Sequence, residues 1–254
     1  MHGKTPLLLA AFLTWIAGFV DAVGYISLGH IYTANMSGNT VAIGIHAVSR
    51  EWPALLERLW PVVTYFGGLL FCRLLIANGA RQRIRRIATP ALLIEIGLLL
   101  PVCLISGPVK GTAAELSVAY IGLLAVAMGI QNAALTHFST LTVHTGFVTG
   151  TLLKCAENLA KYIDWAWDQV RRKEQPLSKV FRSSTRQKSF RMSAWLGLIW
   201  LAYVIGACCG AFGDHIFSFR SLMAPIICLA GVSALDLNRP LAVREEQQQS
   251  DRPS

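Results

Sequence analysis

The chain alternates long apolar blocks with short polar segments. Each block holds roughly 20 residues, the length of helix that crosses a hydrocarbon core of about 30 Å. Because unpaired backbone groups are costly in lipid, each block is expected to be a helix. The pattern therefore predicts an all-α polytopic membrane protein with six transmembrane helices, at residues 6–28, 59–77, 90–106, 116–135, 193–212 and 216–235.

Composition supports this class, since 54% of the residues are hydrophobic and 15% are charged, well away from the average soluble protein. A signal peptide is the alternative for the first block. That block is longer than a typical signal-peptide core, contains Asp21 and lacks a clear small-residue cleavage site. We therefore expect it to remain as a transmembrane helix.

The basic residues lie mainly in two of the connections. Four arginines separate the second and third blocks, and many Lys and Arg residues separate the fourth and fifth. Since such residues are retained in the cytoplasm, we predict a multi-pass membrane protein with cytoplasmic N- and C-termini. This alternation also explains the net charge of +9, so we expect no nucleic-acid partner.

A motif recurs in the two halves of the chain. Gly18-Phe-Val-Asp21-Ala followed by Asn35-Met-Ser-Gly38-Asn39-Thr40 corresponds to Gly129-Ile-Gln131-Asn132-Ala followed by Thr149-Gly150-Thr151. Gly129 follows Gly18 by 111 residues and Gly150 follows Gly38 by 112, while Tyr65-Phe-Gly-Gly68 resembles Tyr203-Val-Ile-Gly206. Each half holds three spans, and an odd number inverts the second half, as in many transporters.

The repeat defines the expected domains. Residues 1–110 form the first membrane repeat and residues 111–235 the second, which includes a basic cytoplasmic insertion at about 161–192. Residues 236–254 are expected to be a disordered cytoplasmic tail.

The paired motifs closely resemble those of the YoaK-like family of bacterial membrane proteins, known as domain of unknown function 1275. The resemblance runs over about residues 7–235, with both motifs in the right order. It implies a multi-span inner-membrane protein, and it carries no activity that can be transferred. Where members of that family commonly have Thr-Gly-Asn, this chain has Ser37-Gly38-Asn39, which keeps the hydroxyl group.

Each repeated motif precedes a short segment that fits a re-entrant half-helix, at about 37–48 and 149–160. Ser37 or Asn39 is the expected N-cap of the first, and Gly38 allows close backbone approach. Two helix N-termini near the midplane would favour an anion or a dipolar solute. The alternative is that these small and hydroxyl residues only pack helices together.

Asp21 lies about 21 Å along the first helix, at about 1.5 Å per residue. A carboxyl group at that depth marks either a functional site, such as a proton or cation site, or a hydrogen bond that fixes packing. Its repeat partner is Asn132. Glu95 and Arg73 could form an ion pair, or Arg73 could extend to the lipid headgroups.

The function that we expect is a transporter or channel for a small polar solute or anion, with a site near the midplane between the repeats. The alternative is a membrane scaffold or assembly protein. No acid–base pair, nucleophile with a base, or Cys/His metal pattern is apparent, so we expect no enzyme activity, no cofactor and no metal. The expected partners are the lipid bilayer and a small polar solute or anion, and the protein could also form a homo-oligomer. The expected substrate-binding residues are Asp21, Asn35, Ser37, Gly38, Asn39, Thr40, Gln131, Asn132, Thr149, Gly150 and Thr151.

Overall fold

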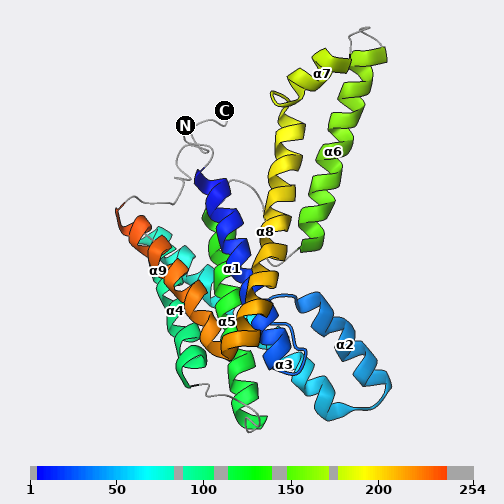
Figure 1. The fold of residues 1–254 in the computed structure, drawn as a ribbon. Coiled ribbons are helices and arrows are strands. Elements are labelled where there is room, and N and C mark those ends of the chain that lie inside the picture. Colours follow the sequence, from blue (N-terminus) through cyan, green and yellow to red (C-terminus); the bar gives the residue numbers. More distant parts are fainter. Residues whose placement is uncertain (1–4, 83–87, 106–113, 139–147, 172–176, 239–254) are drawn as a thin grey trace.

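A computed structural model describes residues 5–82, 88–105, 114–138, 148–171 and 177–238. These residues form helices without strands, arranged as an elongated bundle with two projecting arms (Figure 1). The elements are α1 (Thr5–Ser27), α2 (Met36–Val48), α3 (Trp52–Arg81), α4 (Ala88–Ile105), α5 (Ala114–Phe138), α6 (Val148–Arg171), α7 (Leu177–Ser184), α8 (Lys188–Phe217), the 3-10 helix η1 (Ser218–Leu222) and α9 (Met223–Asn238).

The six predicted spans overlap α1, α3, α4, α5, α8 and α9, and the last of them begins at the end of α8 and includes η1. Within the described residues, four stretches are long and apolar enough to cross a membrane: Leu7–Ser27, Trp52–Arg81, Leu116–Thr136 and Lys188–Leu237. The last of these takes in α8, η1 and α9, and a shorter apolar helix covers Thr89–Leu104. The prediction of an all-α protein with membrane-spanning helices is therefore confirmed.

Two helices extend further into polar segments than we predicted from the sequence. The helix predicted at 149–160 runs on to Arg171, so it occupies the first part of the segment assigned to the basic insertion. α7 and the start of α8 occupy most of the remainder. α9 includes residues 236–238, which we had placed in the disordered tail, and residues 239–254 lie outside the described part.

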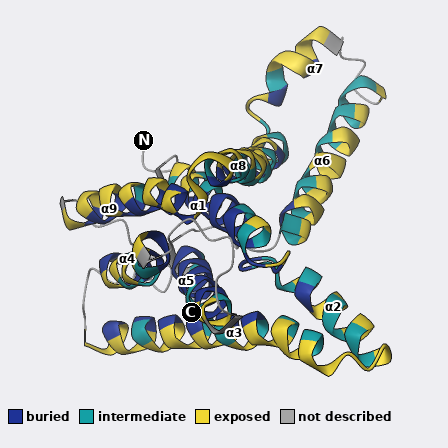
Figure 2. Ribbon diagram, turned by 60° about the horizontal axis from the view of Figure 1, so that its bottom comes forward, coloured by how far each residue is buried: buried dark blue, intermediate teal, exposed yellow. Residues whose placement is uncertain are grey.

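The core is built by two helix pairs that cross the halves of the chain. α1 packs along α8, and α3 packs along α5, while α4 contacts both α5 and α9. α2 lies against α3 and α6 lies against α8, forming the two arms that extend from the bundle (Figures 1 and 2). Buried residues concentrate on α1 and α5, and the outer faces of the surrounding helices are exposed (Figure 2).

Glycines allow both main pairs to approach closely. A Cβ atom on Gly206 of α8 would collide with the backbone carbonyl of Trp15 on α1, and a Cβ atom on Gly68 of α3 would collide with that of Val126 on α5. Small residues at such contacts are typical of membrane helices, where backbones must approach closely to gain packing energy. In both helix crossings, therefore, a glycine lets the two backbones come into contact.

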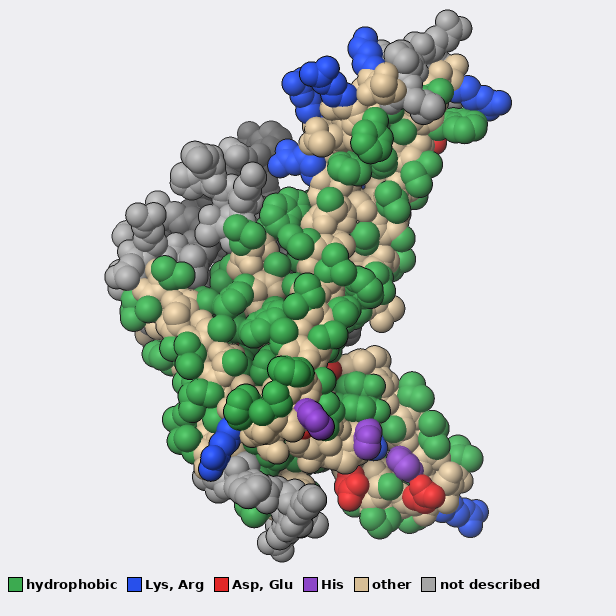
Figure 3. All heavy atoms as spheres, in the orientation of Figure 1, with side chains coloured by type: hydrophobic (Ala, Val, Ile, Leu, Met, Phe, Trp, Pro, Cys, Tyr) green, Lys and Arg blue, Asp and Glu red, His purple; other side chains and the backbone are tan. Residues whose placement is uncertain are grey.

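Hydrophobic and basic side chains occupy different parts of the surface. Hydrophobic side chains cover most of the bundle face seen in Figure 3. Phe66, Leu70 and Ile205 are among the exposed large hydrophobic residues. Lys and Arg side chains gather at the far end of the arm formed by α6, α7 and α8 (Figure 3). An apolar belt beside a basic end is the distribution expected when lipid tails meet lipid headgroups.

Candidate functional site

Asp21 lies on α1 and is almost completely buried. Its Oδ1 atom accepts hydrogen bonds from the backbone N–H groups of Thr33 (2.7 Å) and Ala34 (2.8 Å) and from the Thr33 hydroxyl (3.3 Å). Its Oδ2 atom accepts a hydrogen bond from the hydroxyl of Tyr203 on α8, at 2.7 Å. The carboxyl group thus joins α1, the segment before α2, and α8.

The equivalent position in the second half makes an equivalent contact. Asn132 on α5 is buried, and its side-chain amide donates a hydrogen bond to the hydroxyl of Tyr65 on α3. Tyr203 follows Tyr65 by 138 residues, and the two begin the similar Tyr-x-x-Gly segments of the two halves. We did not predict these contacts from the sequence, in which the two similarly placed tyrosines were the available signal.

The start of α2 is held by Asn39. Its amide donates to the carbonyl of Tyr32 at 2.7 Å, and its Oδ1 accepts from the Tyr32 backbone N–H at 3.3 Å. Gly38 lies against the Tyr32 ring, where a Cβ atom would be too close. The N-cap prediction was wrong: α2 begins at Met36 after Asn35, which makes no side-chain cap bond, and Asn39 lies inside the helix.

Three hydroxyl residues of the motifs are exposed near the starts of α2 and α6. Ser37 donates to the side-chain oxygen of Asn35 (2.7 Å) and Thr40 donates to the carbonyl of Met36 (2.8 Å), while Thr149 is exposed at the start of α6. Both views place the first turns of α2 and α6 near each other beside α8, with the helix bodies diverging (Figures 1 and 2). Thr151 is buried, and Gly150 is partly buried.

Gln131 and Glu95 differ from the other buried polar residues. In the described part of the chain, neither oxygen of the Glu95 carboxyl group has a hydrogen-bond partner, and the Gln131 amide nitrogen has none. The suggested Glu95–Arg73 pair does not form, because Arg73 donates instead to the hydroxyl of Thr136 at 2.6 Å. The lack of hydrogen-bond partners could not be predicted from the sequence, because it depends on how the helices pack.

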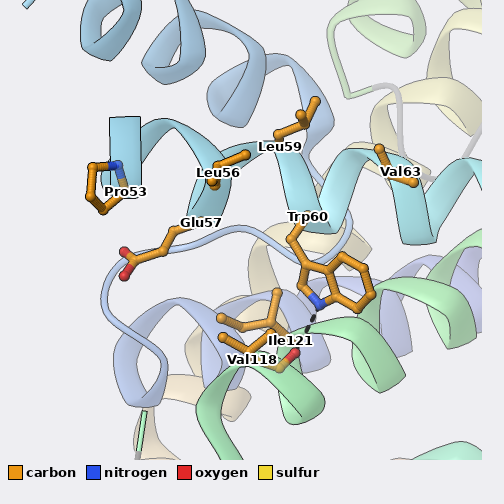
Figure 4. A pocket seen from close by; sticks show the side chains of 8 residues that line it. All are labelled: Pro53, Leu56, Glu57, Leu59, Trp60, Val63, Val118 and Ile121. Carbon is orange, nitrogen blue, oxygen red and sulfur yellow. Dashed lines mark hydrogen bonds between the residues drawn. The ribbon is translucent and has the colours of Figure 1, made fainter. Parts of the chain in front are cut away.

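A separate groove of about 320 Å³ lies between the first turns of α3 and α5 (Figure 4). Its walls are mostly hydrophobic, and Trp60 crosses it to donate a hydrogen bond to the carbonyl of Val118 at 2.9 Å. None of the expected substrate-binding residues lines this groove. Its chemistry suits a hydrocarbon chain better than a polar solute.

The His, Cys, Asp and Glu residues of the described helices and turns do not form a metal site or a disulfide. Among the described residues no group of three or more His, Cys, Asp and Glu side chains could hold a metal ion. The six cysteines are free, and Cys72 and Cys103 are buried packing residues.

The fold and the apolar surface define an α-helical, multi-span membrane protein. The chain belongs to the family described as "Protein of unknown function (DUF1275)", whose model matches residues 9–235. It is similar to the UPF0700 transmembrane protein YoaK of Bacillus subtilis (strain 168), with 23% identity over 224 residues that cover 88% of this chain and 91% of that protein. No solved structure matches the chain. The predicted YoaK-like resemblance is therefore confirmed.

Proposed function

We propose that the protein is a transporter or channel for a small polar solute or anion, with its site between two halves of opposite orientation. The observation that carries this proposal is the pair of equivalent hydrogen bonds across the halves. Asp21 of the first half bonds Tyr203 of the second, and Asn132 of the second bonds Tyr65 of the first. Each half thus supplies one member of each contact.

The backbone contacts follow the same exchange. A Cβ atom on Gly18 would meet the carbonyl of Tyr203, and one on Gly129 would meet the carbonyl of Tyr65. Gly18 and Gly129 are the first residues of the two repeated motifs. An exchange of this kind is expected from two repeats related by an axis in the membrane plane, an architecture that places solute sites at the repeat interface.

The solute class follows from the first turns of α2 and α6. The N-terminal turns of helices present unpaired backbone N–H groups and partial positive charge. The exposed hydroxyls of Ser37, Thr40 and Thr149 stand at these turns. Backbone N–H donors beside polar hydroxyl groups suit an anion or the negative end of a dipolar solute. Asn39 and Asp21 hold the segment before α2 in place, because their side-chain oxygens accept hydrogen bonds from its backbone N–H groups.

The same polar contacts could serve assembly alone, so a membrane scaffold is the second candidate. The basic end of the α6–α7–α8 arm favours it, because exposed Lys179, Arg182 and Arg186 could bind an acidic partner. The exposed hydroxyl groups at the starts of α2 and α6 favour transport instead. We propose no enzymatic role; the ion pair between His46 and Glu51 (2.7 Å) lies at the exposed turn between α2 and α3.

A thermal-shift screen of the detergent-purified protein tests the solute site. Small anions, amino acids and nucleobases are added separately, since a ligand that binds only the folded state stabilises it by about 2.7 kcal/mol at 100 times its Kd. We expect at least one ligand to raise the unfolding midpoint of the wild type, and Thr40→Val and Thr149→Val to abolish the shift.

Thr64→Val is the matched control, because Thr64 makes the same bond to the carbonyl four residues earlier that Thr40 makes. A ligand shift that survives in both Thr40→Val and Thr149→Val would place binding elsewhere. No shift with any ligand would favour the scaffold. If a ligand does shift the midpoint, its uptake into proteoliposomes separates binding from transport.

A further inference from the structure

Glu95 occupies an unusual environment in the middle of α4. Its side chain has no exposed surface, and neither carboxyl oxygen has a hydrogen-bond partner in the described part of the protein. By contrast, the buried Asp21 accepts four hydrogen bonds and Asp236 accepts two from Thr89. Glu95 is therefore a carboxyl group that the fold buries without satisfying.

Its neighbours are apolar on both sides. Ala91, one turn before Glu95, belongs to a small cluster formed by α3, α4 and α5, and Leu99, one turn after it, belongs to the main core. Glu95 thus lies at the seam between the two clusters. On α5, Gln131 likewise lies between residues of the two clusters: it follows Ile130 of the small cluster and precedes Leu135 of the main core by one turn.

The ionisable groups on the helices around α4 do not neutralise a carboxylate there. From α3, Cys72 lies in the small cluster with Ala91, and Arg73 is bonded to Thr136. From α9, Asp236 is bonded to Thr89, and from η1 the Arg220 side chain is exposed. α5 contributes the neutral amide of Gln131 at the same seam.

Burying an ionised carboxylate without a partner costs far more than burying the neutral acid, and more still within a membrane. We propose that Glu95 is a proton-binding site in the interior of the helix bundle, where it is held as the neutral acid. The ligand is the proton itself. If the proposed transport function holds, this residue is the group through which a proton could be coupled to the solute; the proton site itself stands without that function.

Infrared difference spectroscopy of the full-length protein tests the protonation state directly. The wild-type minus Glu95→Gln spectrum at pH 8 should contain the carbonyl stretching band of one protonated carboxylic acid, which shifts in deuterated buffer. Glu95→Gln should leave the thermal unfolding midpoint unchanged, because the amide replaces a neutral group of the same shape. Asp164→Asn should give no such band, since Asp164 is exposed to water.

Labelling with dicyclohexylcarbodiimide gives a second measurement, independent of the stability of any variant. The carboxyl oxygen of a protonated acid adds to the central carbon of the reagent while its proton moves to a reagent nitrogen, and rearrangement leaves a stable N-acylurea. We expect peptide mass spectrometry to find Glu95 modified, with a rate that changes less than about twofold between pH 6 and pH 8, whereas a water-exposed carboxyl group loses about tenfold per pH unit above its pKa.

The proposal is overturned if the difference spectrum lacks the acid band at pH 8. It is also overturned if Glu95 labels only at low pH, as a water-exposed carboxyl group does. A third contrary result is a wild-type midpoint that rises with added Na⁺ or K⁺ while that of Glu95→Gln does not, because Glu95 would then bind a metal cation as a carboxylate. None of these results depends on a solute, so they leave the transport proposal to its own test.

Discussion

Asp21 organises three segments through one carboxyl group. Its oxygens accept hydrogen bonds from Thr33 and Ala34, which precede α2, and from Tyr203 on α8. Asp21→Ala would leave these buried donors without an acceptor, so we expect it to lower the free energy of unfolding by about 3 kcal/mol. Asp21→Asn should cost less, because the amide oxygen keeps one set of donors and the Tyr203 hydroxyl can accept from the amide nitrogen.

Thermal unfolding in detergent checks this order, with the exposed Asp164→Ala as the control. Equal midpoints for Asp21→Ala and Asp164→Ala would show that the hydrogen-bonded cluster contributes nothing to the fold.

The sequence could identify Asp21 and Asn132 as unusual, because polar groups inside apolar blocks are costly in lipid. It could not identify their partners. Tyr203 lies 182 residues from Asp21, and a contact over that distance depends on which helices become neighbours. The same limit explains Glu95, for which an ion pair with Arg73 was a reasonable expectation from the sequence and does not occur.

Adjacent glycines on α3 test the close helix crossing. Gly68 faces the backbone of Val126 on α5, whereas a Cβ atom on Gly67 would meet nothing within 4 Å. Gly68→Ala forces the two helices apart, and we expect it to destabilise the protein by about 1–3 kcal/mol. Gly67→Ala should be neutral or slightly stabilising, since alanine favours the helix. Similar midpoints for the two variants would contradict the observed crossing.

The start of α2 offers a second test at the level of an element. Asn39→Ala removes both hydrogen bonds to the Tyr32 backbone. We expect faster hydrogen exchange at residues 32–40 with little change in α5, because the lost bonds are local. Ser37→Ala is the control, since Ser37 is exposed and bonds only Asn35. Unchanged exchange in Asn39→Ala would contradict the structural role of this side chain.

The apolar helices could be predicted from the sequence because length and hydrophobicity are sufficient to define them. α6 was predicted to end too early because Lys154, Glu157 and Lys161 lower its hydrophobicity. Its apolar residues nevertheless recur with helical spacing, as at Cys155, Leu159 and Tyr162. That periodicity was the signal that would have extended it.

For the whole molecule, the central claim is that two halves lie in opposite orientations in one membrane and enclose a polar site. The sequence predicts the repeat, and α1 packs along α8 while α3 packs along α5, so that each pair joins the two halves of the chain. Packing alone does not assign the two sides of a membrane. The orientation therefore needs a measurement on intact cells.

The most direct measurement labels single cysteines at equivalent connections of the two halves. Ser49→Cys lies between α2 and α3, and Thr185→Cys lies between α7 and α8; both sites are exposed. Each is introduced after replacement of the six native cysteines and treated with an impermeant thiol reagent in spheroplasts and then in inverted vesicles. We predict that Ser49→Cys reacts in spheroplasts and Thr185→Cys reacts in inverted vesicles. Labelling of both from the same side would contradict opposite orientations and remove the basis for a site between inverted halves.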